Sequence, residues 1–330
     1  MTDLHQLKNL NKSLHLNFFR ERIPTRNGYG EGLLQVGKDK RIMVLCADLV
    51  ESTRVLAFKE KYPQQFIEVG VAEQNLVTVA AGLSAVGKIP FVSSYAVFCP
   101  GRCWEQIRTT ICYNNRNVKI IGAHAGISVG PDGATHQMLE DIAIMRSLPN
   151  MVVVVPADYE QTKKATQAIA AYKGPAYMRF AREKTEQMTT TKTPFQIGKA
   201  QVLTHGNDLT IIAAGPVLYE CLRAAAQLEQ KNIHVSVINC HTIKPLDGET
   251  ILTAVRQSKK VITVEEAQIT GGLGGAVTEF LAEHYPVPVK RIGVRDHFGE
   301  SGEPQELLEQ FGFSARHIYK EALSLLGRKR

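Results

Sequence analysis

The stretch Phe66-Ile-Glu-Val-Gly70-Val-Ala-Glu73-Gln-Asn-Leu-Val-Thr-Val-Ala-Ala-Gly-Leu83 joins a short apolar strand, a glycine turn and a helix. Residues 66–69 are predicted to form a strand that ends at Gly70, and Glu73 begins the helix that follows. That helix is apolar nearly all round, which predicts that it is buried. A carboxylate in its first turn is either stabilised by the positive end of the helix dipole or is a buried functional acid.

The same alternation of strand and helix continues on both sides of this unit. Short β-branched runs, predicted as strands, occupy residues 42–45, 66–69, 91–93, 119–121, 151–155, 176–180, 209–213, 235–238, 261–264 and 289–292. Segments with helical periodicity lie between them, at residues 29–38, 73–86, 105–114, 137–147, 159–172, 216–230, 246–258, 274–284 and 304–311. Continuous apolar strands that alternate with helices are typical of parallel sheets covered on both faces. We therefore predict an α/β protein with two doubly wound domains.

A polar, threonine-rich segment predicts where the two domains meet. It includes the run Met188-Thr-Thr-Thr-Lys-Thr-Pro194, a composition typical of a linker. We expect a first domain over residues 1–185, a linker over 186–196 and a second domain over 197–330. The length of 330 residues agrees with two domains of ordinary size.

Composition and charge narrow the classes of function. Hydrophobic residues make up 44% of the chain and charged residues 22%, the balance of an ordinary soluble protein. No apolar run approaches the roughly 18 residues that span a bilayer, and no secretory signal is expected. The net charge of +7 is spread along the chain, which argues against nucleic-acid binding and fits anionic substrates. The six cysteines form no metal-binding or redox pattern, so we expect reduced thiols in a cytoplasmic protein without a membrane partner.

Polar residues gather where the predicted strands of the first domain end. In open parallel sheets, ligands bind beyond the carboxyl ends of the strands. The residues that follow these strands are Asp48, Ser52, Glu73, His124 and Arg182. Tyr95 and Phe98 also follow a strand and could line a slot for a flat ring, although core packing is the simpler explanation for an isolated aromatic pair.

The densest polar stretch is Gly122-Ala-His124-Ala-Gly-Ile-Ser-Val-Gly130-Pro-Asp132-Gly133-Ala-Thr-His136-Gln137. It lies between a predicted strand and a predicted helix. Its glycines let the backbone approach a ligand closely, and long polar loops on a rigid scaffold often carry functional sites. We therefore expect a binding or catalytic site at this loop.

These motifs together resemble the transketolase family. The block from Phe66 to Asn75, the loop from Gly130 to Gln137 and the run Met145-Arg-Ser-Leu-Pro-Asn150 are similar to its pyrimidine-binding domain. The segments Thr25-Arg26-Asn-Gly-Tyr-Gly-Glu31 and Cys46-Ala-Asp48-Leu fit the same domain. Residues 197–330 resemble the transketolase C-terminal domain. The resemblance begins near residue 20 and covers nearly all of the chain.

The resemblance implies a binding site for thiamine diphosphate. Glu73 matches the glutamate that bonds the pyrimidine ring of this cofactor and takes part in catalysis. Tyr95 and Phe98 match aromatic residues that pack against the same ring. The family often has a third aromatic residue where this chain has Gly101 or its neighbours, so the rear wall of the ring pocket departs from the pattern.

The resemblance also implies a binding site for a sugar phosphate. The residues that match the family's phosphate-binding groups are Arg26, Ser52, His124 and Arg182. Asp132 matches an aspartate that binds a substrate hydroxyl, and His136 matches a catalytic residue that can donate or relay a proton near the carbonyl oxygen. Arg179 is close in sequence, but Arg182 fits the phosphate role better.

One domain of the family has no counterpart in this sequence. That domain holds the cofactor diphosphate and carries a Gly-Asp-Gly motif, which the sequence lacks. The resemblance therefore implies the C-terminal subunit of a split transketolase. A partner subunit would supply Gly-Asp-Gly and hold most of the contacts to Mg²⁺ or Ca²⁺, with no metal ligands expected from this chain. We expect a self-associating chain in an α2β2 heterotetramer that transfers a two-carbon ketol unit from a ketose phosphate to an aldose phosphate.

Other readings of the motifs stay open. Deoxyxylulose-phosphate synthases and the β subunits of 2-oxo acid dehydrogenases share the cofactor and parts of this layout. The former usually have Tyr-Pro-Arg-Gly where this chain has Phe180-Ala-Arg-Glu183. A non-catalytic assembly subunit is an alternative of another class, and the intact Glu73 argues against it.

Overall fold

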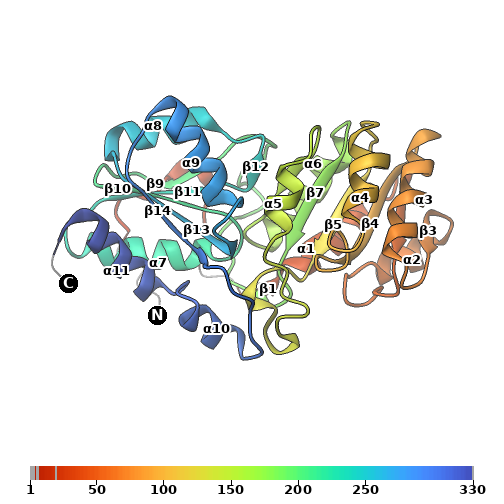
Figure 1. Ribbon diagram of the computed structural model, residues 1–330, viewed down its shortest axis with the longest axis horizontal. Coiled ribbons are helices and arrows are strands. Elements are labelled where there is room, and N and C mark those ends of the chain that lie inside the picture. Colours follow the sequence, from red (N-terminus) through yellow and green to blue (C-terminus); the bar gives the residue numbers. More distant parts are fainter. Residues whose placement is uncertain (1–3, 5–6, 19–20, 329–330) are drawn as a thin grey trace.

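The alternating strands and helices form two α/β domains that lie side by side (Figure 1). The structure is a computed structural model that describes residues 4, 7–18 and 21–328. The predicted fold class is confirmed. In the described part of the chain, no helix is both long enough and apolar enough to cross a membrane. All six cysteines are buried free thiols.

The first domain is built on a sheet with the strand order β12-β6-β7-β5-β4-β2-β3. The strands are β2 (Ile42–Cys46), β3 (Phe66–Glu68), β4 (Ile89–Tyr95), β5 (Lys119–Ala123), β6 (Val152–Val154), β7 (Ala176–Phe180) and β12 (Thr242–Lys244). They run parallel except β12, which pairs antiparallel with β6. The carboxyl ends of the parallel strands therefore share one edge of the sheet, as the position of the candidate site requires.

Helices cover both faces of this sheet. They are α1 (Thr25–Val36), α2 (Leu56–Lys61), α3 (Glu73–Ala85), α4 (Trp104–Gln106), α5 (Asp141–Arg146) and α6 (Tyr159–Ala171). Strand β2 is buried along its whole length, because Ile42 and Val44 pack with α1, α2 and α6 while Met43 and Leu45 pack with α3. Burial on both faces explains why this strand is continuously apolar rather than alternating.

The second domain has a sheet in the order β14-β13-β10-β11-β9. Its strands are β9 (Gln201–Thr204), β10 (Leu209–Ala213), β11 (Val235–Asn239), β13 (Val261–Gln268) and β14 (Val289–Val294). Its helices are α7 (Leu218–Glu229), α8 (Gly248–Ser258), α9 (Leu273–His284), α10 (Pro304–Gln310) and α11 (Ala315–Leu326). Helices α7 and α11 pack on one face, and α8 and α9 pack on the other.

The two domains exchange pieces of chain. Strand β12 comes from the second half of the sequence, yet it extends the sheet of the first domain. Conversely, Leu10 pairs with Thr204 of β9, and Leu14 packs in the apolar cluster under α7 and α11. Leu10 and Leu14 thus contact the second domain, although the prediction assigned residues 1–185 to the first.

The predicted strands all appear, but some elements differ from the prediction. The helix expected over residues 137–147 begins only at Asp141, and residues Ile127–Asp132 form a 3₁₀ turn. The helix expected over 105–114 is short and continues as a π-helical segment, Ile107–Cys112. Helices α2 and α11 and strands β9 and β12 were not predicted. A small antiparallel pair, β1 (Ile23–Pro24) with β8 (Lys184–Thr185), lies beside the expected linker.

Candidate active site

Glu73 stands at the first position of α3, just beyond the end of β3. It is buried, with 4% of its surface exposed. One carboxylate oxygen, Oε2, accepts a hydrogen bond from Arg102 Nη1 at 3.2 Å. The other, Oε1, is buried and has no hydrogen-bond partner among the described residues. Because a buried acceptor without a donor costs free energy, this oxygen is available to a ligand that brings its own donor.

A group of rings lies next to Glu73. The Arg102 guanidinium lies 4.2 Å from the centre of the Phe98 ring, and Phe98 stacks on Tyr95 with 5.8 Å between ring centres. Tyr95 in turn stacks on His124 at 4.2 Å. The edge of His136 contacts Phe98 at 5.5 Å between ring centres. The residues predicted to hold a flat ring therefore form one continuous group with two of the predicted polar residues.

The predicted phosphate-binding residues begin where the rings end. Arg26 lies in the first turn of α1, and its Nη1 donates to the Ser52 carbonyl oxygen at 3.2 Å. The same nitrogen is 3.5 Å from Nε2 of His124. We call Arg26, His124, Arg182 and the Ser52 backbone the arginine corner. Two of its atoms, Nε of Arg26 and Nδ1 of His124, are buried without a partner among the described residues. The corner is rich in donors and offers few acceptors, as an anion site requires.

Arg182, whose positive charge acts on both Arg26 and His124, meets Asp132 near them. The side chains of Arg182 and Asp132 form an ion pair of 3.1 Å, and both are partly exposed. Arg179 points elsewhere: it is buried, pairs with Asp141 at 3.2 Å and donates to the Glu266 carbonyl oxygen at 2.6 Å. Arg179 therefore joins the two domains, while Arg182 pairs with Asp132 of the glycine-rich loop.

The surroundings of His124 keep its imidazole uncharged. Its pKa is lowered from 6.5 to about 3, first by burial and then by the positive charges of Arg26 and Arg182. Burial also lowers the pKa of Arg26, with further contributions from Arg54 and Arg182. An anion bound here would offset these like charges, so the corner gains most from a ligand with a full negative charge.

The second domain supports the loop that carries Asp132 and His136. Glu266, on β13, accepts a hydrogen bond from the Ser128 backbone N–H at 3.1 Å. The Gln137 side-chain amide donates to the carbonyl oxygens of Ile127 and Glu300, at 3.1 and 2.8 Å. Gly133 has a φ of +70°, and a Cβ there would lie 2.4 Å from Ser301 Oγ. The second domain therefore shapes the loop without placing its own side chains among the predicted site residues.

The structure thus brings the predicted residues together along one edge of the first sheet. The contacts run from Glu73 through Arg102, Phe98, Tyr95 and His124 to Arg26. Sequence reasoning missed Arg102, which fills the place left open near Gly101 by lying on Phe98 and pairing with Glu73. It also missed Arg54, which follows Ser52 by two positions.

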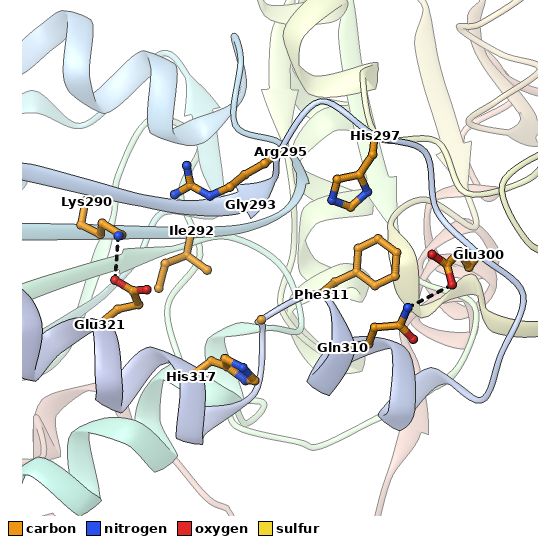
Figure 2. A pocket seen from close by; sticks show the side chains of 11 residues that line it. Lys290, Ile292, Gly293, Arg295, His297, Glu300, Gln310, Phe311, His317 and Glu321 are labelled. Atoms are coloured by element: carbon orange, nitrogen blue, oxygen red, sulfur yellow. Dashed lines mark hydrogen bonds and ion pairs between the residues drawn. The ribbon is translucent and has the colours of Figure 1, made fainter. Parts of the chain in front are cut away.

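A cavity also lies away from these residues. A cavity of about 360 Å³ on the second domain is lined by β14 and the α10–α11 region and contains none of the predicted site residues. Figure 2 shows that its charged side chains are partly satisfied among themselves: Lys290 pairs with Glu321 at 2.7 Å, and Gln310 donates to Glu300 at 3.0 Å. Within the described residues, no cluster of His, Cys, Asp and Glu could hold a metal ion.

Known proteins match the chain in both domains. The profile of the transketolase pyrimidine-binding domain matches residues 21–187, and that of the transketolase C-terminal domain matches residues 198–318. A putative transketolase C-terminal section from Methanocaldococcus jannaschii is 47% identical, over 90% of this chain and 95% of that protein. A 6-deoxy-6-sulfo-D-fructose transketolase subunit from a Clostridium species is 41% identical, over 92% of this chain and 95% of that subunit.

A solved structure gives the same assignment. A split-gene transketolase, described as an inactive β4 tetramer, is 45% identical and superposes with a TM-score of 0.87 over 93% of this chain and 100% of that chain. The order of the two matched domains and the length of the matches agree with the C-terminal section of a split transketolase. The resemblance noted in the motifs is confirmed, and the chain belongs to the transketolase family.

Proposed function

We propose that this chain is the C-terminal subunit of a thiamine-diphosphate-dependent transketolase. It transfers a two-carbon ketol unit from a ketose phosphate to an aldose phosphate, and it acts only with a partner subunit that carries the diphosphate-binding domain. The observation that carries the proposal is the buried, unpartnered Oε1 of Glu73, whose carboxylate is joined through Arg102 to the ring of Phe98. The continuous contacts from there to the arginine corner support a substrate with a phosphate at its far end.

The residues of the site fit the pyrimidine end of thiamine diphosphate. Glu73 Oε1 would accept from a ring N–H, which would satisfy its missing hydrogen bond. Phe98 and Tyr95 would hold the ring by stacking, and Arg102 would keep Glu73 in place. Thiamine diphosphate supplies carbanion chemistry when bound, and the protein positions it. The role of Glu73 is to hold a proton at the ring nitrogen.

The other predicted residues would bind and orient the sugar phosphate. Arg26, Arg182 and neutral His124 would donate to the phosphate oxygens. A planar guanidinium group can donate two parallel hydrogen bonds to one phosphate, which suits the two arginines to this role. Asp132 would accept from a substrate hydroxyl, and His136 would donate to or relay a proton at the carbonyl oxygen. Asp132 pairs with Arg182 at 3.1 Å, so a bound phosphate would compete for Arg182 and leave the carboxylate to the substrate.

Several parts of the proposal concern the assembly. The partner subunit would bring Gly-Asp-Gly and hold Mg²⁺ or Ca²⁺ on the cofactor diphosphate. Two copies of each subunit would form the α2β2 complex, in the cytoplasm. The related Clostridium subunit is named for a sulfo-sugar and a Phocaeicola vulgatus relative, 38% identical, for apulose 4-phosphate. Both names support an anionic sugar as the substrate class.

Reconstitution tests the proposal. The full chain is combined with a polypeptide that carries the Gly-Asp-Gly domain, thiamine diphosphate and Mg²⁺, and ketol transfer is followed between sugar phosphates. We expect activity that falls at least about 100-fold in Glu73→Gln, because the proton-holding carboxylate is lost. Glu249→Gln is the matched control, since its side chain is 86% exposed on α8.

The same assay separates the alternatives. Decarboxylation of pyruvate in place of ketol transfer would favour a deoxyxylulose-phosphate synthase or a 2-oxo acid dehydrogenase subunit. Full activity of the Glu73→Gln complex would instead favour a non-catalytic assembly subunit.

A further inference from the structure

Arg54 lies at the edge of the arginine corner, and neither the motifs nor the proposed function uses it. It follows Ser52 and Thr53 in the loop after β2. Its Nε donates to Oδ1 of Asn27 at 3.0 Å, and Asn27 is the neighbour of Arg26 in the first turn of α1. Arg26 donates back to the Ser52 carbonyl oxygen at 3.2 Å. These two hydrogen bonds link the loop after β2 to the first turn of α1 and keep Arg54 near Arg26.

The backbone at Arg54 is held in an unfavourable conformation. Its φ is +65°, a left-handed value that costs a side chain other than glycine of the order of 1–2 kcal/mol. The backbone of Arg54 also packs tightly against α1, because a Cβ at Gly30 would lie only 2.6 Å from its carbonyl oxygen. Such a conformation persists where the surroundings impose it, and at functional sites it often positions a side chain.

The charges around the corner are unbalanced. Among the described residues, neither Arg26 nor Arg54 has a carboxylate within ion-pair distance, whereas Arg182 pairs with Asp132 and Glu183 at 3.1 and 3.5 Å. The positive charge of Arg54 is felt inside the corner, because it lowers the pKa of both Arg26 and His124. Like charges held close together favour an anion that offsets them.

We propose that Arg54 is a specificity residue of this corner, which favours substrates that end in a doubly charged phosphate over those that end in a singly charged sulfonate. The inference rests on the proposed function, because it assumes that the corner holds the charged end of the substrate. Arg54 is exposed and its Nε is occupied by Asn27, so it acts mainly through its charge. Phosphate and sulfonate both present three oxygens, and the difference between them is one negative charge.

A charge effect has a characteristic ratio. Coulomb energy is proportional to the charge of the ligand. Removing Arg54 should therefore cost a dianion twice as much binding free energy as it costs a monoanion. The fold-increase in the dissociation constant of a sulfonate should therefore be about the square root of the fold-increase for a phosphate. With an exposed charge, we expect a loss of about 3- to 10-fold for the phosphate.

Binding of small anions to the full chain tests this without the partner subunit. The probes are methyl phosphate at pH 8, where it is a dianion, and methanesulfonate, a monoanion, at one ionic strength, with dissociation constants from calorimetry or NMR. Arg54→Gln should weaken methyl phosphate about 3- to 10-fold and methanesulfonate about 2- to 3-fold. Arg54→Lys should restore most of the loss, and Arg256→Gln, an exposed arginine on α8, should change neither.

The outcomes separate the inference from the proposed function. If the wild-type chain binds methyl phosphate and Arg54→Gln binds it equally well, the inference is wrong and the sugar-phosphate assignment stands. Equal losses for the two probes would also overturn it, because they would mean a contact that does not depend on ligand charge. If the wild-type chain binds neither anion, both the inference and the phosphate corner fail, whatever the reconstituted complex does.

Discussion

Replacing His124 should change how the stability of this protein depends on pH. In the folded chain the pKa of His124 is about 3, whereas an unfolded histidine has its ordinary value of 6.5. Below pH 6.5, His124 therefore binds a proton in the unfolded chain but not in the folded chain. The contribution of neutral His124 to the free energy of unfolding is fully present above pH 6.5. It decreases as the pH falls below that value and stops decreasing near pH 3.

The size of the effect follows from the difference in proton binding. At pH 5 the unfolded histidine lies about 1.5 pH units below its pKa, and each unit corresponds to 1.36 kcal/mol. His124 alone should therefore lower the free energy of unfolding by about 2 kcal/mol between pH 7.5 and pH 5. His241, whose burial lowers its pKa to about 4, adds a similar loss that remains in the variant.

Urea denaturation of the wild type and of His124→Gln, at pH 7.5 and pH 5 and at one protein concentration, measures this difference. The variant should lose about 2 kcal/mol less than the wild type over this interval. The exposed His205→Gln is the control and should follow the wild type. Equal losses in His124→Gln and the wild type would show that His124 is not held neutral, and the account of the arginine corner would have to change.

Two further predictions concern packing and the support of the site loop. Gly28→Ala should lower the free energy of unfolding by about 1–3 kcal/mol, because the new Cβ would lie 2.2 Å from the Tyr159 carbonyl oxygen. Gly82→Ala, in α3, should raise the free energy of unfolding by about 0.5–1 kcal/mol, because nothing lies within 4 Å of the new Cβ. Similar urea midpoints for the two variants would contradict the packing of α1 on α6. Glu266→Ala should speed amide exchange at Ser128 by about tenfold or more, because the 3.1 Å hydrogen bond is lost, and unchanged exchange would mean that the second domain does not hold this loop.

The strands were predictable because burial on both faces requires continuous apolar runs, as in β2. Helix α11, at Ala315–Leu326, was missed although its apolar residues lie on one face and it ends at Gly327. Helix α5 begins at Asp141 rather than at the expected residue 137, and this difference has a physical reason. The Gln137 side chain bonds backbone carbonyls, one of them at Glu300, and these distant contacts override local helical periodicity. Strand β12 has only three residues, and its position depends on a sheet formed by the other domain.

The position of the candidate residues in the fold was predictable where they follow the ends of strands, as for Glu73 and His124. The motifs could not give the partners of these residues. Arg102 lies 29 positions from Glu73, in a loop whose length departs from the family, so nothing in the sequence pairs the two. Arg54 stands beside Ser52, but its relevance comes from a left-handed backbone and a hydrogen bond to Asn27 that only the folded chain reveals.

The exchange of chain between the domains limits how this protein can be divided. A cut within residues 186–196 would leave β6 without its neighbour β12, exposing an unpaired strand edge that invites aggregation. The same cut would remove the N-terminal segment that pairs with β9 and packs under α11. One apolar cluster also joins Ile142 and Met145 to Ile243 and Leu273. We therefore expect that exchanging either domain for a foreign one at a single junction would break these contacts, so that the two domains have to be engineered together.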